Sequence, residues 1–208
     1  MIDRKTLFFD LLQKELNQEG FVYKKAKNQF VKKDEMGNEF IYEFNIWPQF
    51  KMIEAGFRIL IKQVEDVKKK AWGKLYSKFE SLGKEKPYLT KEPSEGHSWT
   101  NTEENVRLAV KKEIDFYHSS LKGYFSKHLD LKYLDKVLNT IPGEELYISH
   151  NAIFSCFLAI IVAKLVNNPD LDSLFPIYRA VVEKFNGNYL NEYDLLQKHL
   201  LHHDKLTR

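Results

Sequence analysis

Apolar and polar residues recur along this chain with two different periods, and the change between them separates predicted helices from predicted strands. In residues 3–19, five apolar side chains follow helical spacing: Leu7, Phe8, Leu11, Leu12 and Leu16. Asp3 precedes this stripe as a plausible N-cap, and Gly20 follows it where a helix commonly ends in the left-handed conformation. The chain is therefore predicted to open with an amphipathic helix.

From Phe21 the period shortens towards two, as expected for strands that are buried on one face. Residues 34–38 are turn formers between two apolar runs, which predicts a hairpin. Alternation continues through Phe40–Ile46, breaks at Pro48 and is clearest over Ile53–Ile61. Such short connections favour an antiparallel meander of three or four strands. Its apolar face needs helical cover, for which the first helix is the natural candidate.

The rest of the chain has mainly helical periodicity. Helices are predicted at 64–81, 102–121, 130–139, 144–167, 170–185 and 189–203. The run Lys68–Lys70 falls mostly off the apolar stripe of its helix and is interpreted as a solvated surface. The segment 83–101 has no sustained period and is longer than ordinary loops, so it is interpreted as a connector or a flap.

These patterns predict an α+β fold in which an N-terminal helix and a three- or four-stranded antiparallel meander pack on a mostly helical C-terminal part. We expect residues 1–208 to form a single unit. Within it, 1–82 would supply helix, sheet and helix, 83–101 the long connector, and 102–208 the helical part.

Composition supports a globular protein and argues against strong phosphate binding. Of 208 residues, 43% are hydrophobic and 29% are charged, which excludes disorder as the main state. The formal net charge is +3, from 19 basic and 15 acidic residues in 1–100 and 13 and 14 in 101–208. This small excess of basic residues is spread along the sequence and does not form the dense positive patch that strong phosphate binding needs, so a nucleic-acid partner is not favoured.

The sequence also favours a cytoplasmic protein without a membrane span. Its single cysteine, Cys156, lies in an apolar run and suits a buried thiol in a reducing compartment. Asp10 interrupts the apolar residues near the N-terminus, so no core of signal-peptide length is found. The most apolar stretch, 152–163, is far shorter than the roughly 20 residues of a membrane span. It is interpreted as a buried core helix, and no cofactor is expected.

One resemblance bears on the N-terminal half. The first helix leads into Gly20-Phe21-Val22-Tyr23-Lys24-Lys25, then Gln29-Phe30-Val31 and the two strands that follow. This order resembles a bacterial domain family of unknown function that carries the number 4304. The resemblance covers mainly residues 5–65 and extends by pattern to Val106–Leu138. It implies an α+β fold with an N-terminal helix and a meander, and it brings no functional residues.

Histidines provide the candidate metal-binding residues. His199, His202 and His203 occupy about one turn of the last predicted helix, where two imidazoles can share a face. A site would need another ligand from elsewhere, and solvated surface histidines are the alternative. His150 follows Glu144 and Glu145 at the start of the most apolar helix, where carboxylates also simply complement the helix dipole.

Two further groups are candidate interaction residues. Tyr88, His97 and Trp99 lie on the long connector, where they either anchor it to the core or contact a ligand as part of a lid. A basic group flanks Tyr23 and Phe30, as in some single-stranded nucleic-acid platforms, and consists of Lys24, Lys25, Lys27, Lys32 and Lys33. The alternative is that the aromatic residues belong to the core and the lysines protect a sheet edge.

Three hypotheses about function follow. The first is a non-enzymatic protein-interaction module, favoured by the one-faced sheet, the 14% aromatic content and the missing nucleotide, hydrolase and calcium motifs. The second is an enzyme, such as a metal-dependent hydrolase, with a pocket near His150 or His199–His203. The third is weak nucleic-acid binding through the basic strands.

Overall fold

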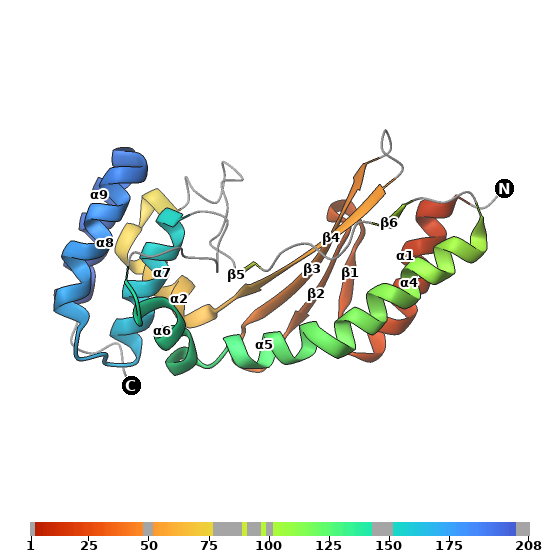
Figure 1. The fold of residues 1–208 in the computed structure, drawn as a ribbon, viewed down its shortest axis with the longest axis horizontal. Coiled ribbons are helices and arrows are strands. Elements are labelled where there is room, and N and C mark those ends of the chain that lie inside the picture. The colour runs from red at the N-terminus through yellow and green to blue at the C-terminus, as the bar shows by residue number, and fades with distance from the viewer. Residues whose placement is uncertain are drawn as a thin grey trace. The chain divides into compact units, whose positions relative to one another are not determined.

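The computed structural model describes residues 3–47, 52–76, 89–90, 97–98, 102–142 and 152–202 (Figure 1). The chain divides into two compact units, each built from two stretches of sequence. Met1–Ile59 and Thr90–Ser126 form the sheet unit, and Leu60–Leu89 and Lys127–Arg208 form the helical unit. The predicted α+β class is confirmed: an N-terminal helix precedes a four-stranded antiparallel sheet, and the C-terminal part is mostly helical.

The sheet is the predicted meander. Its elements are α1 (Arg4–Gln18), β1 (Val22–Lys24), the 3₁₀ turn η1 (Lys25–Lys27), β2 (Gln29–Lys33), β3 (Glu39–Trp47) and β4 (Met52–Leu60). The strands lie in the order β1-β2-β3-β4, so each is hydrogen-bonded to the strand that follows it. The antiparallel register pairs Val22 with Val31, and Phe30 with Tyr42. Short connections explain this order, because they leave each strand beside its predecessor.

Local chemistry sets the ends of α1 and the hairpin between β2 and β3. The Asp3 carboxylate accepts a hydrogen bond from the backbone N–H of Lys5 at 3.2 Å, as an N-cap does. After the helix, Gly20 takes φ +86°, a conformation that glycine adopts without strain. In the hairpin, the Asp34 carboxylate accepts from the backbone N–H of Asn38 at 2.8 Å, which fixes the turn between β2 and β3.

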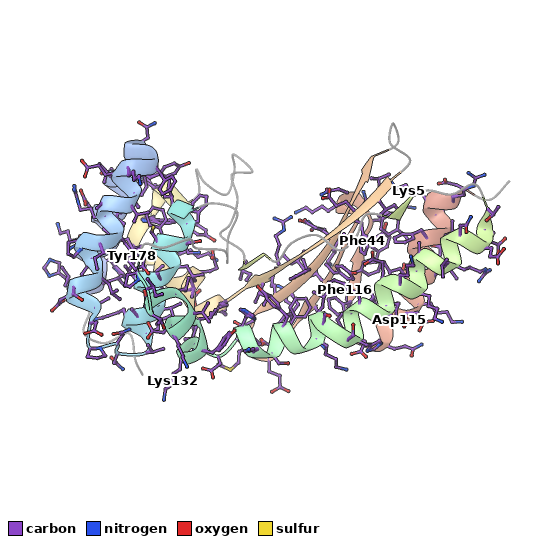
Figure 2. All side chains as sticks on the ribbon, viewed as in Figure 1. Lys5, Phe44, Asp115, Phe116, Lys132 and Tyr178 are labelled. Atoms are coloured by element: carbon purple, nitrogen blue, oxygen red, sulfur yellow. The ribbon has the colours of Figure 1, made fainter. Side chains whose placement is uncertain are left out.

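One face of the sheet, named the helix face, packs against α1 and the long helix after the connector. This helix comprises α4 (Glu103–Phe116), the π-helical turn η3 (Tyr117–Leu121) and α5 (Lys122–His128). The ring centroids of Phe8 and Phe44 (the latter labelled in Figure 2) lie 5.5 Å apart, and those of Phe40 and Phe125 lie 5.0 Å apart. The prediction that helix 1 covers the sheet is therefore confirmed.

Two short strands come from the predicted connector. They are β5 (Leu89–Thr90) and β6 (His97–Ser98), and both pair with β4. In β6, the Cα partner of His97 is Ile53. Parts of the segment 83–101 thus extend the sheet beyond β4, while its other residues lie outside the described part of the chain.

The helical unit is organised around a helix that is buried on all sides. Its elements are α2 (Lys62–Trp72), α6 (Leu131–Asn139), α7 (Ala152–Leu165), α8 (Leu171–Asn186), the 3₁₀ turn η4 (Gly187–Tyr189) and α9 (Leu190–His202). Every residue from Ile153 to Ala163 on α7 is buried. The Trp72 ring on α2 meets Phe157 on α7 with centroids 5.3 Å apart. The expected core helix is confirmed.

Buried tyrosines fasten α6, α8 and α9 through backbone carbonyls. The Tyr178 hydroxyl, on α8 (labelled in Figure 2), donates to the Leu138 carbonyl at 2.7 Å. The Tyr193 hydroxyl, on α9, donates to the Phe175 carbonyl at 2.8 Å. Burial raises the pKa of both tyrosines, so both hydroxyls keep their protons at neutral pH. These bonds satisfy polar groups that the packing removes from water.

Two local predictions need correction. The helix predicted at 64–81 is interrupted at Gly73, which takes φ +50°, so α2 ends at Trp72 and residues 74–76 are helical again beyond it. Lys68 is fully buried, although the run Lys68–Lys70 was expected to be solvated. Among the described residues, no helix combines the length and apolar character that crossing a membrane requires.

Candidate functional site

The face of the sheet opposite the helix face carries a regular array of polar side chains and is named the polar face. Successive side chains of a strand point to opposite sides, so this face has the residues that alternate with the aromatic core. Its described residues are Val22, Lys24, Gln29, Val31, Lys33, Glu39, Ile41, Glu43, Asn45, Glu54, Gly56 and Arg58, of which Ile41 is buried. The ring contacts between sheet and helices involve the other face.

A carboxylate network lies at the centre of the polar face. Glu43 Oε2 accepts a hydrogen bond from Gln29 Nε2 at 3.0 Å and another from the guanidinium of Arg58. The side chains of Glu43 and Arg58 are 21% and 23% exposed, so this ion pair is partly desolvated and still in contact with solvent. The three residues come from β2, β3 and β4, which makes the network a product of strand register.

Glycine at position 56 gives the Glu43 side chain its room. A Cβ atom at Gly56 would lie 3.6 Å from both Cγ and Oε1 of Glu43. Gly56 has no positive φ, so the backbone conformation does not require a glycine there. Glycine inside a strand costs stability and often marks a place where another molecule approaches the backbone closely.

A basic turn adjoins this network at the edge of the sheet. Lys24 ends β1, and Lys25 and Lys27 belong to η1; all three side chains are exposed. None of the three forms an ion pair with another described residue. The preceding position on the same face, Val22, is 55% exposed. Positive charge therefore collects beside an exposed apolar side chain at this edge.

The five lysines predicted as one basic group do not share a surface. Lys24 and Lys33 lie on the polar face, and Lys33 forms an ion pair with Glu39 at 2.7 Å. Lys32 alternates to the helix face, where its Nζ atom lies 5.9 Å from the centre of the Phe21 ring. Lys25 and Lys27 lie in η1. Only Lys24, Lys25 and Lys27 remain as a cluster.

The aromatic residues between these lysines pack against the core. Phe30 is fully buried, and its ring stacks on Tyr23 with centroids 4.7 Å apart. Tyr23 in turn stacks on Phe9 of α1 at 5.1 Å. Phe30 has no exposed surface on which a nucleic-acid base could stack, as an aromatic platform would need. The core alternative is confirmed for Phe30, and Tyr23 is half-buried at the edge of the core.

A buried ionic triad, missed from the sequence, lies in the helical unit. The Lys68 ammonium donates to Glu65 Oε1, and the Tyr76 hydroxyl donates to Glu65 Oε2 at 2.7 Å. Burial lowers the pKa of Lys68, and Glu65 offsets part of that effect. Lys68 has no exposed surface, so the triad is better suited to structure than to reaction with a substrate.

Another charged group joins α1 to the π-helical turn. Glu19 accepts hydrogen bonds from Lys122 Nζ at 3.0 Å and from the Tyr117 hydroxyl at 3.3 Å, and His118 Nδ1 lies 3.7 Å away. The bond from Lys122 lowers the pKa of Glu19, so this carboxylate is ionised at neutral pH and is not a proton donor. It acts as a clamp within the sheet unit.

The predicted metal and connector residues are only partly described. His199 is half-buried on α9 and His202 is exposed, while His150, His203, Tyr88 and Trp99 lie outside the described residues. His97 is placed in β6 at the sheet, but its side chain is not described. Within the described ranges, no three His, Cys, Asp or Glu side chains gather as a metal site would require. The hydrolase hypothesis stays a prediction.

Cys156, the single cysteine of the chain, was predicted to be a core residue rather than a reactive thiol. It is fully buried on α7, and burial raises its pKa to about 12. A thiol in this state is a weak nucleophile, since the thiolate is the reactive form. The interpretation as core packing is confirmed.

No family model, curated protein or solved structure matches this chain. The resemblance to family 4304 therefore stays a prediction. The geometry of the described residues therefore identifies the candidate site, which consists of the polar face and the adjoining basic turn.

Sequence reasoning missed Glu43, Arg58 and Gly56 as one group. The alternating pattern places each of them on the polar side of a strand, which was the available signal. It could not show that the three converge, because the register between β3 and β4 depends on the loop that joins them.

Proposed function

We propose that this protein is a non-enzymatic protein-interaction module whose polar face binds an acidic segment of a partner protein. The observation that carries the proposal is the basic turn: three exposed lysines within four positions, without an ion pair in the described part of the chain. An acidic partner would supply the missing counter-charges, which speeds association and selects the partner.

The neighbouring residues support a peptide rather than a phosphate backbone. Val22 offers an exposed apolar contact next to the lysines. Glu39 and Glu43 occupy the same face, where they would repel a phosphate backbone that is charged at every nucleotide, whereas a peptide can place its acidic residues at the turn alone. Together with the burial of Phe30 and the packing of the half-buried Tyr23 ring against it, this favours an acidic segment with apolar side chains over single-stranded nucleic acid.

The test is a fluorescence-anisotropy titration of the full-length protein with a short labelled peptide in which glutamate alternates with valine. The variant reverses the charge of the turn: Lys24→Glu, Lys25→Glu and Lys27→Glu together. The matched control reverses three exposed lysines elsewhere in the sheet unit: Lys14→Glu, Lys111→Glu and Lys112→Glu. Both variants change the net charge equally, so a difference between them reports the location of binding.

We expect the turn variant to weaken peptide binding by about tenfold or more, which corresponds to about 1.4 kcal/mol, and the control to change it far less. Binding to the wild type should also weaken as salt rises. No measurable binding, or an equal loss in both variants, would overturn the proposal. Tighter binding of a uridine-rich RNA oligonucleotide than of the peptide would replace it with nucleic-acid binding.

A further inference from the structure

The carboxylate of Glu43 has one oxygen in use and one that remains available. Both hydrogen bonds to this side chain, from Gln29 and from Arg58, end on Oε2. Within the described residues, Oε1 accepts no hydrogen bond, although an ionised carboxylate can accept several. The two donors hold the carboxylate in place, so Oε1 is a preorganised acceptor.

The surroundings of Oε1 lack the side chain that would normally cover it. A Cβ at Gly56 would stand 3.6 Å from this oxygen, and glycine leaves that volume empty. Replacing the glycine would meet only ordinary van der Waals contact, so packing does not explain its presence. A bare backbone next to an available acceptor is the arrangement expected where a ligand approaches closely.

The register of the strands places this acceptor in line with the basic turn. Lys24 pairs with Gln29, Gln29 pairs with Glu43, and the Glu43 side chain lies beside Gly56. These positions form a row across the sheet on the polar face. Two strand spacings separate Lys24 from Glu43, or about 10 Å, which an extended peptide spans in about three residues.

We infer that Glu43 is a specificity-determining residue that accepts a cationic side chain of the partner above Gly56. The partner segment then carries an acidic residue that meets Lys24 and a lysine or arginine about three positions away. This inference rests on the proposed function, because it specifies the sequence of the segment that the polar face binds. It also explains why a carboxylate lies on a face that attracts acidic residues at its edge.

Two peptides and two variants test the inference by fluorescence anisotropy. One peptide carries glutamate and, three positions on, lysine; in the other, glutamine replaces the lysine. The protein variants are Gly56→Ala, which places a methyl group beside Oε1, and Glu43→Gln, which removes the charge. Glu39→Gln is the matched control, since Glu39 lies on the same face and pairs with Lys33.

We expect the wild type to prefer the lysine peptide by about tenfold, the scale of one charged hydrogen bond. Gly56→Ala and Glu43→Gln should each remove most of this preference, and Glu39→Gln should retain it. Thermal unfolding provides a folding check. Alanine in a strand is more stable than glycine, so Gly56→Ala should bind less well while melting at the same temperature or higher.

The possible outcomes separate this inference from the proposed function. If both peptides bind equally, through Lys24, Lys25 and Lys27, the interaction module stands and the role of Glu43 is wrong. If neither peptide binds, both proposals fall. A preference for the lysine peptide that survives in Gly56→Ala and Glu43→Gln would also overturn the assignment, because the cation would then contact another group.

Discussion

The buried pair of Glu65 and Lys68 makes the sharpest prediction about stability. Glu65→Gln removes the negative charge that compensates the Lys68 ammonium. Lys68 has no exposed surface, so water cannot solvate the ammonium in place of the lost carboxylate. Removing one partner of a buried ion pair typically lowers the free energy of unfolding by about 3–5 kcal/mol. We expect a loss of this size for the helical unit. The double variant Glu65→Gln with Lys68→Met should recover most of it, because no uncompensated charge remains.

The pH dependence gives an independent measure of the same interaction. Burial lowers the pKa of Lys68 below its ordinary value of 10.5. Between the folded-state and unfolded-state pKa values, the unfolded chain binds a proton that the folded chain does not, so stability rises with pH. The slope approaches about 1.4 kcal/mol per pH unit at most. Glu65→Gln should lower the folded-state pKa of Lys68 further, so the rise of stability with pH should begin at a lower pH. Lys68→Met should abolish this rise in stability.

The assay is urea unfolding followed by the fluorescence of Trp72, which lies in the helical unit against Phe157. The background protein carries Trp47→Phe and Trp99→Phe, so that Trp72 is the only one of three tryptophans left. Lys70→Met is the matched control, since Lys70 is exposed on the same helix. An equal effect of Lys68→Met and Lys70→Met, or a cost of Glu65→Gln below about 1 kcal/mol, would refute the buried-pair argument.

Three further predictions concern stability, each measured by chemical unfolding. Tyr42→Phe should destabilise the sheet unit by about 1–3 kcal/mol, because the buried Glu113 carboxylate loses the hydroxyl that donates to it; no change would mean that another donor replaces it. The pKa of Glu19 is lowered in the folded protein, so its ionised carboxylate contributes fully to stability above about pH 4.5. This stabilisation is lost as the pH falls through the folded-state pKa of Glu19. Glu19→Gln should flatten this acid dependence by less than about 1 kcal/mol, since its partners are exposed, and an unchanged profile would contradict the clamp. Asp130→Ala should cost about 0.5–2 kcal/mol, because its carboxylate caps α6 by accepting from two backbone N–H groups; a neutral result would show that water caps the helix equally well.

Much of the secondary structure was predictable because it depends on local periodicity. The opening helix, the hairpin and meander, and the C-terminal helices follow from which positions are apolar. Asp3, Gly20 and Asp34 mark ends and turns through their own backbone chemistry, which needs no knowledge of distant residues. The break at Gly73 has the same local origin, because its positive φ divides the helix predicted at 64–81, and residues 74–76 are helical beyond it.

The candidate site was predicted only in part. Lys24, Lys25 and Lys27 were identified from charge, but Lys32 and Lys33 were grouped with them, because the sequence does not show which face of the sheet each side chain occupies relative to the helices. The central network was missed entirely. Glu43 is separated from Gln29 by 14 positions and from Arg58 by 15, and only strand pairing brings their side chains together.

The sequence by itself determined the types of the elements, the apolar side of each and the burial of Cys156 in the most apolar helix. Tertiary structure decided which element covers which. Lys68 shows the difference: nothing local distinguishes it from Lys69 and Lys70, yet it is buried and they are exposed, because other elements pack over its side of α2. The periodicity of the sequence shows which face of a helix or strand is apolar, whereas long-range packing decides which other element lies against that face. The buried charges and the row from Lys24 to Gly56 therefore follow from the fold rather than from local sequence.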